Sequence, residues 1–256
     1  MTPTPVGMRC PECAKQTTTV RSVRDEPSAW QKSPVTVSII AINVAVFVLG
    51  LALDGGSGLM GGGIGELQRR GGLFAPLVAN GEWWRIVTSG FLHFGIIHIA
   101  FNMFLVYMLG SQIEMALGGR RYVLVFGGAL LAGSLGATLA QPLSLSAGAS
   151  GAGFGLMGAY GVVAWARGIN IQETGVLPLI VINLVITFTI PGISWGAHLG
   201  GLLGGALLAF LFAELDDRRN LFGKAKFAPE AIAVLFGIAC FIGTNAAAHA
   251  AVQGLV

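Results

Sequence analysis

The stretch GAHLGGLLGGALLAF, residues 196–210, places one histidine beside two rows of glycine in a segment that carries no charge. Each row repeats every four residues: the first holds Gly196, Gly200 and Gly204, the second Gly201 and Gly205. Small residues at this spacing let helices approach closely inside a membrane. The stretch therefore predicts a membrane helix packed tightly against a neighbour. Packing alone would also explain the glycines, since many transporters have similar rows.

The composition excludes a water-soluble globular protein. Hydrophobic residues make up 54% of the 256 residues and charged residues 11%, where about 25% charged is usual for soluble domains. Apolar runs close to the roughly 20 residues that cross a bilayer recur along the chain, and they predict an all-α polytopic membrane protein. The seven expected spans are Val35 to Leu53, Gly95 to Leu117, Tyr122 to Ala140, Ser150 to Ala166, Val176 to Ile190, Ala197 to Ala213 and Ala231 to Val252.

The loop cations predict the orientation. With a cytoplasmic N-terminus, 12 of the 15 Lys and Arg residues fall on the cytoplasmic side, as the positive-inside rule requires. Residues 1–33 contain no apolar core of a cleavable signal peptide, so we expect the first span to direct insertion. The net charge of +3 then reflects topology. We expect a lipid bilayer partner and no nucleic acid.

The three cysteines do not form a disulfide framework. Cys10 and Cys13 form a CPEC motif in the N-terminal tail, and Cys240 lies alone in the seventh span. Structural zinc needs four ligands, and no other Cys or His precedes His93. We therefore predict no metal and no cofactor. The CPEC pair is either a remnant on a disordered tail or half of a metal site completed by a second copy or by further sequence.

Polar residues converge at one depth of the predicted bundle. His93, His98 and Asn102 lie at the start of the second span, Ser150 begins the fourth, and His198 lies near the start of the sixth. Even-numbered spans all begin at the outer face, so these residues share a level just below it. Each alone would be an ordinary interhelical hydrogen bond. Together they predict a functional site, because polar groups are costly in a membrane.

The cluster has the groups that acyl transfer requires. A serine hydroxyl becomes a good nucleophile only beside a positioned base, and His198 is the expected base for Ser150. No Asp or Glu lies near His198 at that depth, so we expect a dyad oriented by packing. The free amides at the start of the fourth span, with His98 and Asn102, are expected to hold the oxyanion.

At these residues the sequence resembles the rhomboid family of intramembrane serine proteases. The resemblance rests on GASG around Ser150, AHLGG around His198 and HFGIIHIAFN, which contains His98 and Asn102. It covers about Val35 to Ala213, and also includes Trp84-Arg85 and Glu114. It implies a six-helix bundle with Ser150 as nucleophile, His198 as base, and His98, Asn102 and the Ser150 amide as the oxyanion hole. Substrates would be single-pass transmembrane proteins cut near the outer face.

Two features depart from the common family pattern. Phe154 stands where several bacterial members carry a tyrosine that packs on the base; it keeps the aromatic face and lacks the hydroxyl. The seventh span resembles the six-plus-one members. We therefore expect a cytoplasmic tail at 1–33, a catalytic core at 34–215, a linker at 216–229 and a seventh helix at 230–256, in a bacterial plasma membrane with the C-terminus outside.

Two other functions stay open on the sequence. A rhomboid-like protein can bind membrane proteins or act in quality control without catalysis, and a small transporter could line its path with the same polar residues. Transporters place their sites at the midplane between repeats, whereas this cluster lies near one face. His93 is expected to brace the first loop or line a water pocket, Arg85 and Glu114 to hold structure, and His249 to be interfacial. The sequence does not indicate the oligomeric state.

Overall fold

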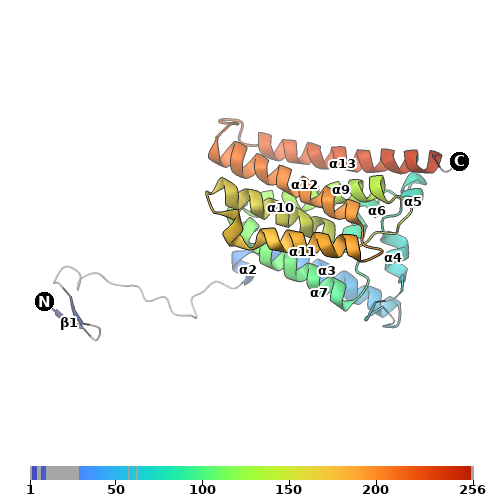
Figure 1. Cartoon of the computed structure of the whole chain (residues 1–256), viewed down its shortest axis with the longest axis horizontal. Coiled ribbons are helices and arrows are strands. Elements are labelled where there is room, and N and C mark those ends of the chain that lie inside the picture. Colours follow the sequence, from blue (N-terminus) through green and yellow to red (C-terminus); the bar gives the residue numbers. More distant parts are fainter. Residues whose placement is uncertain (1, 5–6, 10–28, 57, 62, 255–256) are drawn as a thin grey trace.

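The computed structural model describes residues 2–4, 7–9, 29–56, 58–61 and 63–254. Long helices run roughly side by side and form one bundle (Figure 1). Near the N-terminus, β1 (Thr2–Thr4) and β2 (Gly7–Arg9) form a short antiparallel pair. Cys10 and Cys13 lie outside the described residues.

Among the residues that the structure describes, five helices are long and apolar enough to cross a membrane. They are α3 (Pro34–Leu53), the continuous helix Ile96–Leu117, α9 (Gly119–Ala140), the continuous helix Trp195–Arg218, and α13 (Ala228–Gln253). Two shorter helices, α10 (Ser150–Ala166) and α11 (Val176–Thr189), complete the bundle. The predicted all-α polytopic membrane fold is confirmed.

Two of the long helices contain a stretch of π-helix. The second membrane helix consists of α7 (Ile96–Leu105), a π segment (Val106–Gly110) and α8 (Ser111–Leu117). The sixth consists of α12 (Trp195–Ala209) and a π segment, Phe210–Arg218. The predicted end of the sixth span at Ala213 is therefore too early. The helix continues through Glu214, which is fully buried and is paired with Arg218 and Arg219 at 3.0 and 2.6 Å.

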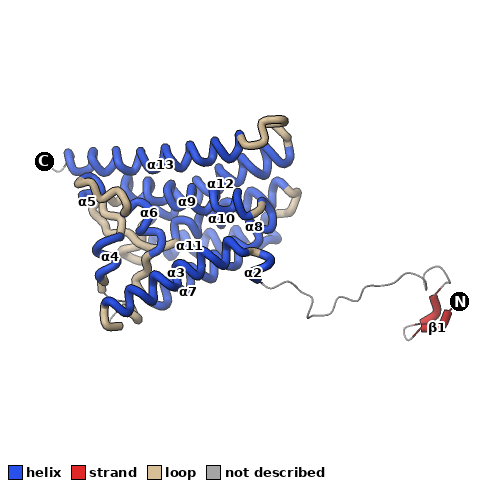
Figure 2. Tube along the Cα trace, turned by 180° about the vertical axis from the view of Figure 1, so that it is seen from behind, coloured by secondary structure: helices blue, strands red, loops and turns tan. Residues whose placement is uncertain are grey.

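The segment between α3 and α7 is folded, and it gathers at one end of the bundle (Figure 2). Its helical turns are α4 (Glu66–Gly71), α5 (Ala75–Ala79), α6 (Arg85–Thr88) and a 3₁₀ turn (Ser89–Phe91). Two further short turns lie outside this segment: α2 (Ala29–Lys32) before α3, and a 3₁₀ turn (Ile171–Thr174) before α11. Arg85 is 3% exposed and donates to the carbonyls of Arg69 and Gly72 at 2.8 Å, besides pairing with Glu82 at 2.6 Å. One buried guanidinium thus ties three parts of this segment together.

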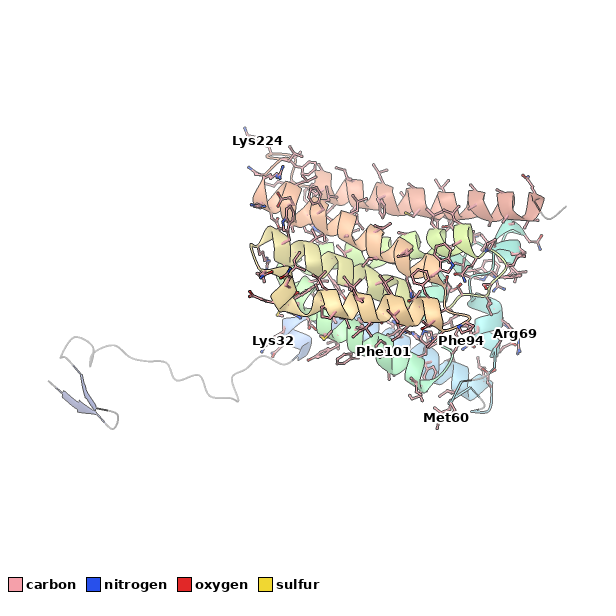
Figure 3. All side chains as sticks on the ribbon, viewed as in Figure 1. Lys32, Met60, Arg69, Phe94, Phe101 and Lys224 are labelled. Carbon is pink, nitrogen blue, oxygen red and sulfur yellow. The ribbon has the colours of Figure 1, made fainter. Side chains whose placement is uncertain are left out.

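The two ends of the bundle differ in their side chains. Lys32 and Lys224 lie at one end, and Met60, Arg69 and Phe94 lie at the other (Figure 3).

Glu114 joins α8 to the start of α3 by accepting hydrogen bonds from the Val35 and Thr36 amides at 2.9 and 2.7 Å. These amides are free at a helix start, so a carboxylate is a favourable partner.

Candidate active site

Ser150 is the first residue of α10, and the segment before it is held by the folded loop region. Leu73 and Ser146 exchange two backbone hydrogen bonds of 2.8 Å, and the Gly148 amide donates to the Ser89 carbonyl at 2.9 Å. Gly148 has φ +135°, which side-chain-bearing residues rarely adopt, and a Cβ there would crowd the ring of His98. The backbone therefore positions Ser150 beside His98.

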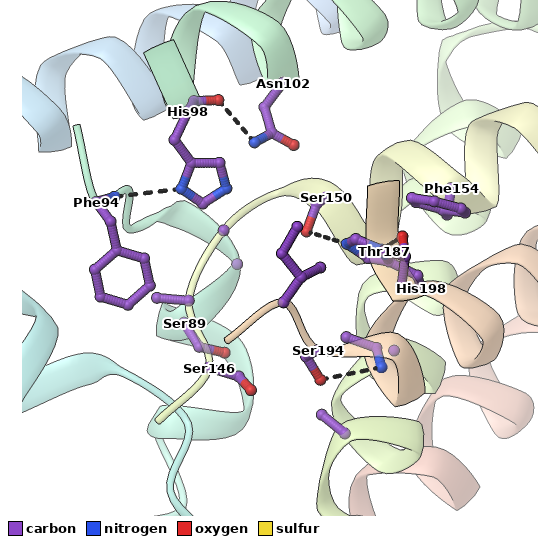
Figure 4. A pocket seen from close by; sticks show the side chains of 18 of the residues that line it. Ser89, Phe94, His98, Asn102, Ser146, Ser150, Phe154, Thr187, Ser194 and His198 are labelled. Carbon is purple, nitrogen blue, oxygen red and sulfur yellow. Dashed lines mark hydrogen bonds between the residues drawn. The ribbon is translucent and has the colours of Figure 1, made fainter. Parts of the chain in front are cut away.

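His198 lies in the first turn of α12, where the Ser194 hydroxyl caps the helix by accepting from the Ala197 amide at 3.3 Å. Its Nε2 lies 2.9 Å from the Ser150 Oγ (Figure 4). This is the hydrogen-bond distance required between a nucleophile and its base.

The contact between α10 and α12 depends on the absence of side chains. A Cβ on Gly201 would overlap the carbonyl oxygen of Gly151, and one on Gly205 would overlap that of Gly155. The second glycine row thus lets the backbones of α10 and α12 meet directly, as the spacing predicts, while the first row faces α9. The close approach brings Ser150 and His198, which are 48 residues apart, within reach of each other.

Two more side chains contact the His198 ring. Phe154, one turn after Ser150, stacks on it with the centroids 4.1 Å apart and the planes inclined by 16°. Thr187 of α11 lies on the other ring nitrogen, with Oγ1 2.7 Å from Nδ1. The sequence reasoning identified the first contact and missed the second. The signal available in the sequence was a polar pair, Asn183 and Thr187, four residues apart on one face of a helix whose other polar residue is Thr189.

His98 and Asn102 border the same cavity as Ser150 and His198 (Figure 4). The Phe94 amide donates to His98 Nδ1 at 3.3 Å, and Asn102 Nδ2 donates to the His98 carbonyl at 2.9 Å. A backbone amide can only donate, so Nδ1 of His98 accepts and Nε2 carries the proton when the ring is neutral. One N–H of the Asn102 amide stays free for another acceptor.

His93 supports the site from outside the membrane helix. It is 1% exposed, and its Nε2 accepts from the Ala149 amide at 3.4 Å. Burial, with a smaller contribution from His98, lowers the pKa of His93 to about 3. The ring is therefore neutral at pH 7 and able to accept this hydrogen bond. Its side chain thus holds Ala149, the residue before Ser150, whereas the roles expected from the sequence, bracing the first loop or lining a water pocket, stay predictions.

The cavity has a volume of about 570 Å³, within the usual range for ligand sites. Apolar residues of α7, including Ile97 and Phe101, line one side, and Ile186 of α11 lines another. The polar groups of Ser150, His98 and Asn102 face into this mainly apolar space. The cavity is thus suited to an apolar ligand that meets a few polar groups.

Other candidate residues lie elsewhere. Arg85 and Glu114 hold loop and helix ends, as described above, and His249 is exposed on α13. Cys240 is buried in α13 as a free thiol. Within the described residues, no three His, Cys, Asp or Glu side chains are grouped as a metal site.

These features define a class: a helical, polytopic membrane protein with a serine and a histidine in hydrogen-bond contact inside a cavity. Residues 80–215 match the family described as Rhomboid domain, just over half of the chain. The chain belongs to the rhomboid family, as its motifs predict.

Several curated relatives support this assignment. The rhomboid protein YdcA of Bacillus subtilis (strain 168) is 38% identical over 146 residues, which are 56% of this chain and 73% of YdcA. Rhomboid protease GluP of the same organism is 35% identical over 181 residues, which are 70% of this chain and 34% of GluP. Rhomboid-like protease 1 of Toxoplasma gondii is 32% identical over 180 residues, covering 67% of this chain and 61% of its own length.

Proposed function

We propose that the protein is an intramembrane serine endopeptidase that cleaves single-pass transmembrane proteins. The observation that carries the proposal is the 2.9 Å contact between Ser150 Oγ and His198 Nε2 inside a cavity lined mainly by apolar residues. The names of the relatives, among them a rhomboid protease and a rhomboid-like protease, favour the same reaction.

In the proposed reaction the Ser150 oxygen attacks the carbonyl carbon of the scissile peptide bond while His198 Nε2 takes the hydroxyl proton. The tetrahedral intermediate collapses when the C–N bond breaks and His198 returns the proton to the leaving amine. Water, deprotonated by the same histidine, then hydrolyses the acyl ester and regenerates Ser150. General-base assistance of this kind typically contributes about 10² to 10⁴ in rate.

The proposed oxyanion hole uses donors that border the cavity containing Ser150. Nε2–H of His98, the free N–H of Asn102 and the Ser150 amide at the start of α10 supply three of them. Fixed donors of this kind stabilise the charge that develops on the carbonyl oxygen. The segment before Ser150, held by Leu73, Ser89 and His93, keeps the amide in place.

We further propose that the site opens toward the outer face of a plasma membrane. Loop cations favour a cytoplasmic N-terminus, and α7, α10 and α12 then all begin at the outer side. Water enters from that side for the hydrolytic step, and the substrate helix is cut near its outer end.

A fluorophosphonate probe tests the assignment directly. Wild-type protein in detergent is expected to be labelled and to cleave a membrane-anchored reporter. Ser150→Ala should lose both activities, and His198→Ala should lose cleavage by at least about 10²-fold because the base is gone. Ser144→Ala, an exposed serine in the same loop, is the matched control and should behave as wild type.

Two results would contradict the proposed protease function or its nucleophile. Folded wild-type protein that neither reacts with the probe nor cleaves any transmembrane reporter would favour a non-catalytic rhomboid-like binding protein. Cleavage that survives in Ser150→Ala would contradict the proposed nucleophile.

A further inference from the structure

The ring of His198 is held at both nitrogens by hydroxyl groups. Nε2 faces Ser150 at 2.9 Å, and Nδ1 faces Thr187 at 2.7 Å. Both Thr187 and His198 are buried, with exposed fractions of 3% and 7%. At such a depth the ring cannot exchange these partners freely with bulk water.

Thr187 has a second contact that determines the direction of the first. Its Oγ1 lies 2.6 Å from the backbone carbonyl oxygen of Asn183, one turn earlier in α11. A carbonyl oxygen only accepts, and two oxygens at this distance are held together only with a hydrogen between them. The single hydroxyl proton of Thr187 is therefore directed at Asn183.

The remaining lone pairs of Thr187 Oγ1 face His198, so Nδ1 must be the donor in that contact. A neutral imidazole carries one proton. With that proton on Nδ1, the lone pair of Nε2 points at the Ser150 hydroxyl. This is the tautomer that can accept the serine proton, whereas the other would direct an N–H at Ser150.

Phe154 cannot make this selection. Its stacked ring fixes the plane of the imidazole, but a stacked face does not distinguish one ring nitrogen from the other. Within the described residues, the two ring nitrogens of His198 have hydrogen bonds to Ser150 and Thr187, and no carboxylate is among these partners.

We propose that Thr187 is the positioning residue of His198, a neutral hydroxyl that accepts from Nδ1–H and so presents the basic nitrogen to Ser150. The proposal deepens the proposed function and rests on it. It also replaces the expectation that packing alone orients the base. Thr187 belongs to α11, and Ile186 of the same helix lines the cavity. In the proposed function, α11 therefore contacts both the base and the substrate.

The kinetic test compares three variants of purified, full-length protein on a transmembrane reporter. Thr187→Val keeps the side-chain shape and removes the hydroxyl; we expect kcat to fall about 10- to 100-fold with KM within about twofold, a loss below that of the base itself. Thr187→Ser restores the hydroxyl and should recover kcat to within about threefold of wild type.

The matched control is Thr189→Val. Thr189 is exposed on the same helix and its hydroxyl bonds the Val185 carbonyl one turn earlier at 2.7 Å, as Thr187 bonds Asn183, but away from the site. It should match wild type in kcat. A Thr187→Val enzyme as active as Thr189→Val would overturn the proposal, as would a Thr187→Ser enzyme no better than Thr187→Val.

A spectroscopic test does not depend on turnover. Solid-state ¹⁵N NMR of protein labelled at its four histidines, with His198 assigned from the spectrum of His198→Gln, reports which ring nitrogen carries the proton. Wild type should show protonated Nδ1 and unprotonated Nε2, and Thr187→Val should lose this preference. Protonated Nε2 in wild type would overturn the proposal. If wild type cleaves nothing, the proposed function fails while this measurement still decides the role of Thr187.

Discussion

At the scale of single residues, the site consists of neutral side chains whose hydrogen-bond directions follow from their fixed partners. The Phe94 amide sets the tautomer of His98, and the Ala149 amide makes Nε2 of His93 an acceptor. Neutral side chains are expected at a site inside a membrane, because an ionised group away from water carries a large desolvation penalty. Neutral groups with one allowed direction can still present donors and acceptors where a reaction needs them.

His93 gives this idea a pH-dependent consequence. Its pKa is about 3 in the folded protein, lowered chiefly by burial, against about 6.5 in an unfolded chain. The unfolded state therefore takes up the proton first, so the contribution to stability is complete above pH 6.5 and is lost as the pH falls toward 3.

We expect the apparent Tm of wild type to drop more between pH 7 and pH 5 than that of His93→Gln, which keeps an acceptor and does not titrate. The extra loss in wild type should correspond to about 1 to 2 kcal/mol in the free energy of unfolding. Thermal unfolding in detergent at both pH values measures it. Parallel pH dependences for the two proteins would show that His93 does not contribute in this way.

At the scale of elements, the pairing of α10 with α12 positions the proposed nucleophile and base. Gly201→Ala would place a methyl group against the Gly151 carbonyl, where backbone meets backbone and no side chain can move aside. We expect a loss of about 1 to 3 kcal/mol in stability and, because the helices separate, at least about a tenfold fall in kcat.

Gly161→Ala on α10 is the matched substitution, because a Cβ there meets no atom within 4 Å. It should leave cleavage unchanged and keep or slightly raise the Tm. Reporter cleavage and thermal unfolding of the two variants make the comparison. Equal behaviour of Gly201→Ala and Gly161→Ala would show that the close approach is unimportant.

The sequence predicted the membrane helices well, because about 20 residues in lipid must be apolar and internally hydrogen-bonded. It placed some helix ends poorly. Hydropathy fell at Glu214, yet the helix continues because Arg218 and Arg219 neutralise that carboxylate. The row of Gly201 and Gly205 predicted the approach of α12 to α10. Thr187 was missed because the spacing of Asn183 and Thr187 marks a polar face of α11 but does not show which neighbouring helix that face meets.

At the scale of the whole molecule, a cluster of charges joins α13 to the rest of the bundle. Arg121 of α9 contacts Asp216 at 2.5 Å and Asp217 at 2.7 Å in the π segment after α12, and Glu230 of α13 at 3.1 Å. Arg120 also pairs with Glu230, at 2.6 Å, but its side chain is 62% exposed against 16% for Arg121. Arg121 is therefore the residue that connects three helices while shielded from solvent.

Two neighbouring substitutions separate this connection from catalysis. Arg121→Gln leaves Asp216 partly buried without its cation and leaves Glu230 with Arg120 alone, which should lower stability by about 1 to 3 kcal/mol, or roughly 5 °C in Tm. Arg120→Gln removes an exposed pair and should cost less than about 1 kcal/mol. Both variants should cleave the reporter normally well below the Tm, since Asp216 and Asp217 lie at the opposite end of the sixth membrane helix from His198. A loss of kcat in folded Arg121→Gln protein would instead show that the attachment of α13 is coupled to the site. Equal Tm values for the two variants would show that Arg121 does not connect the three helices more strongly than Arg120 does.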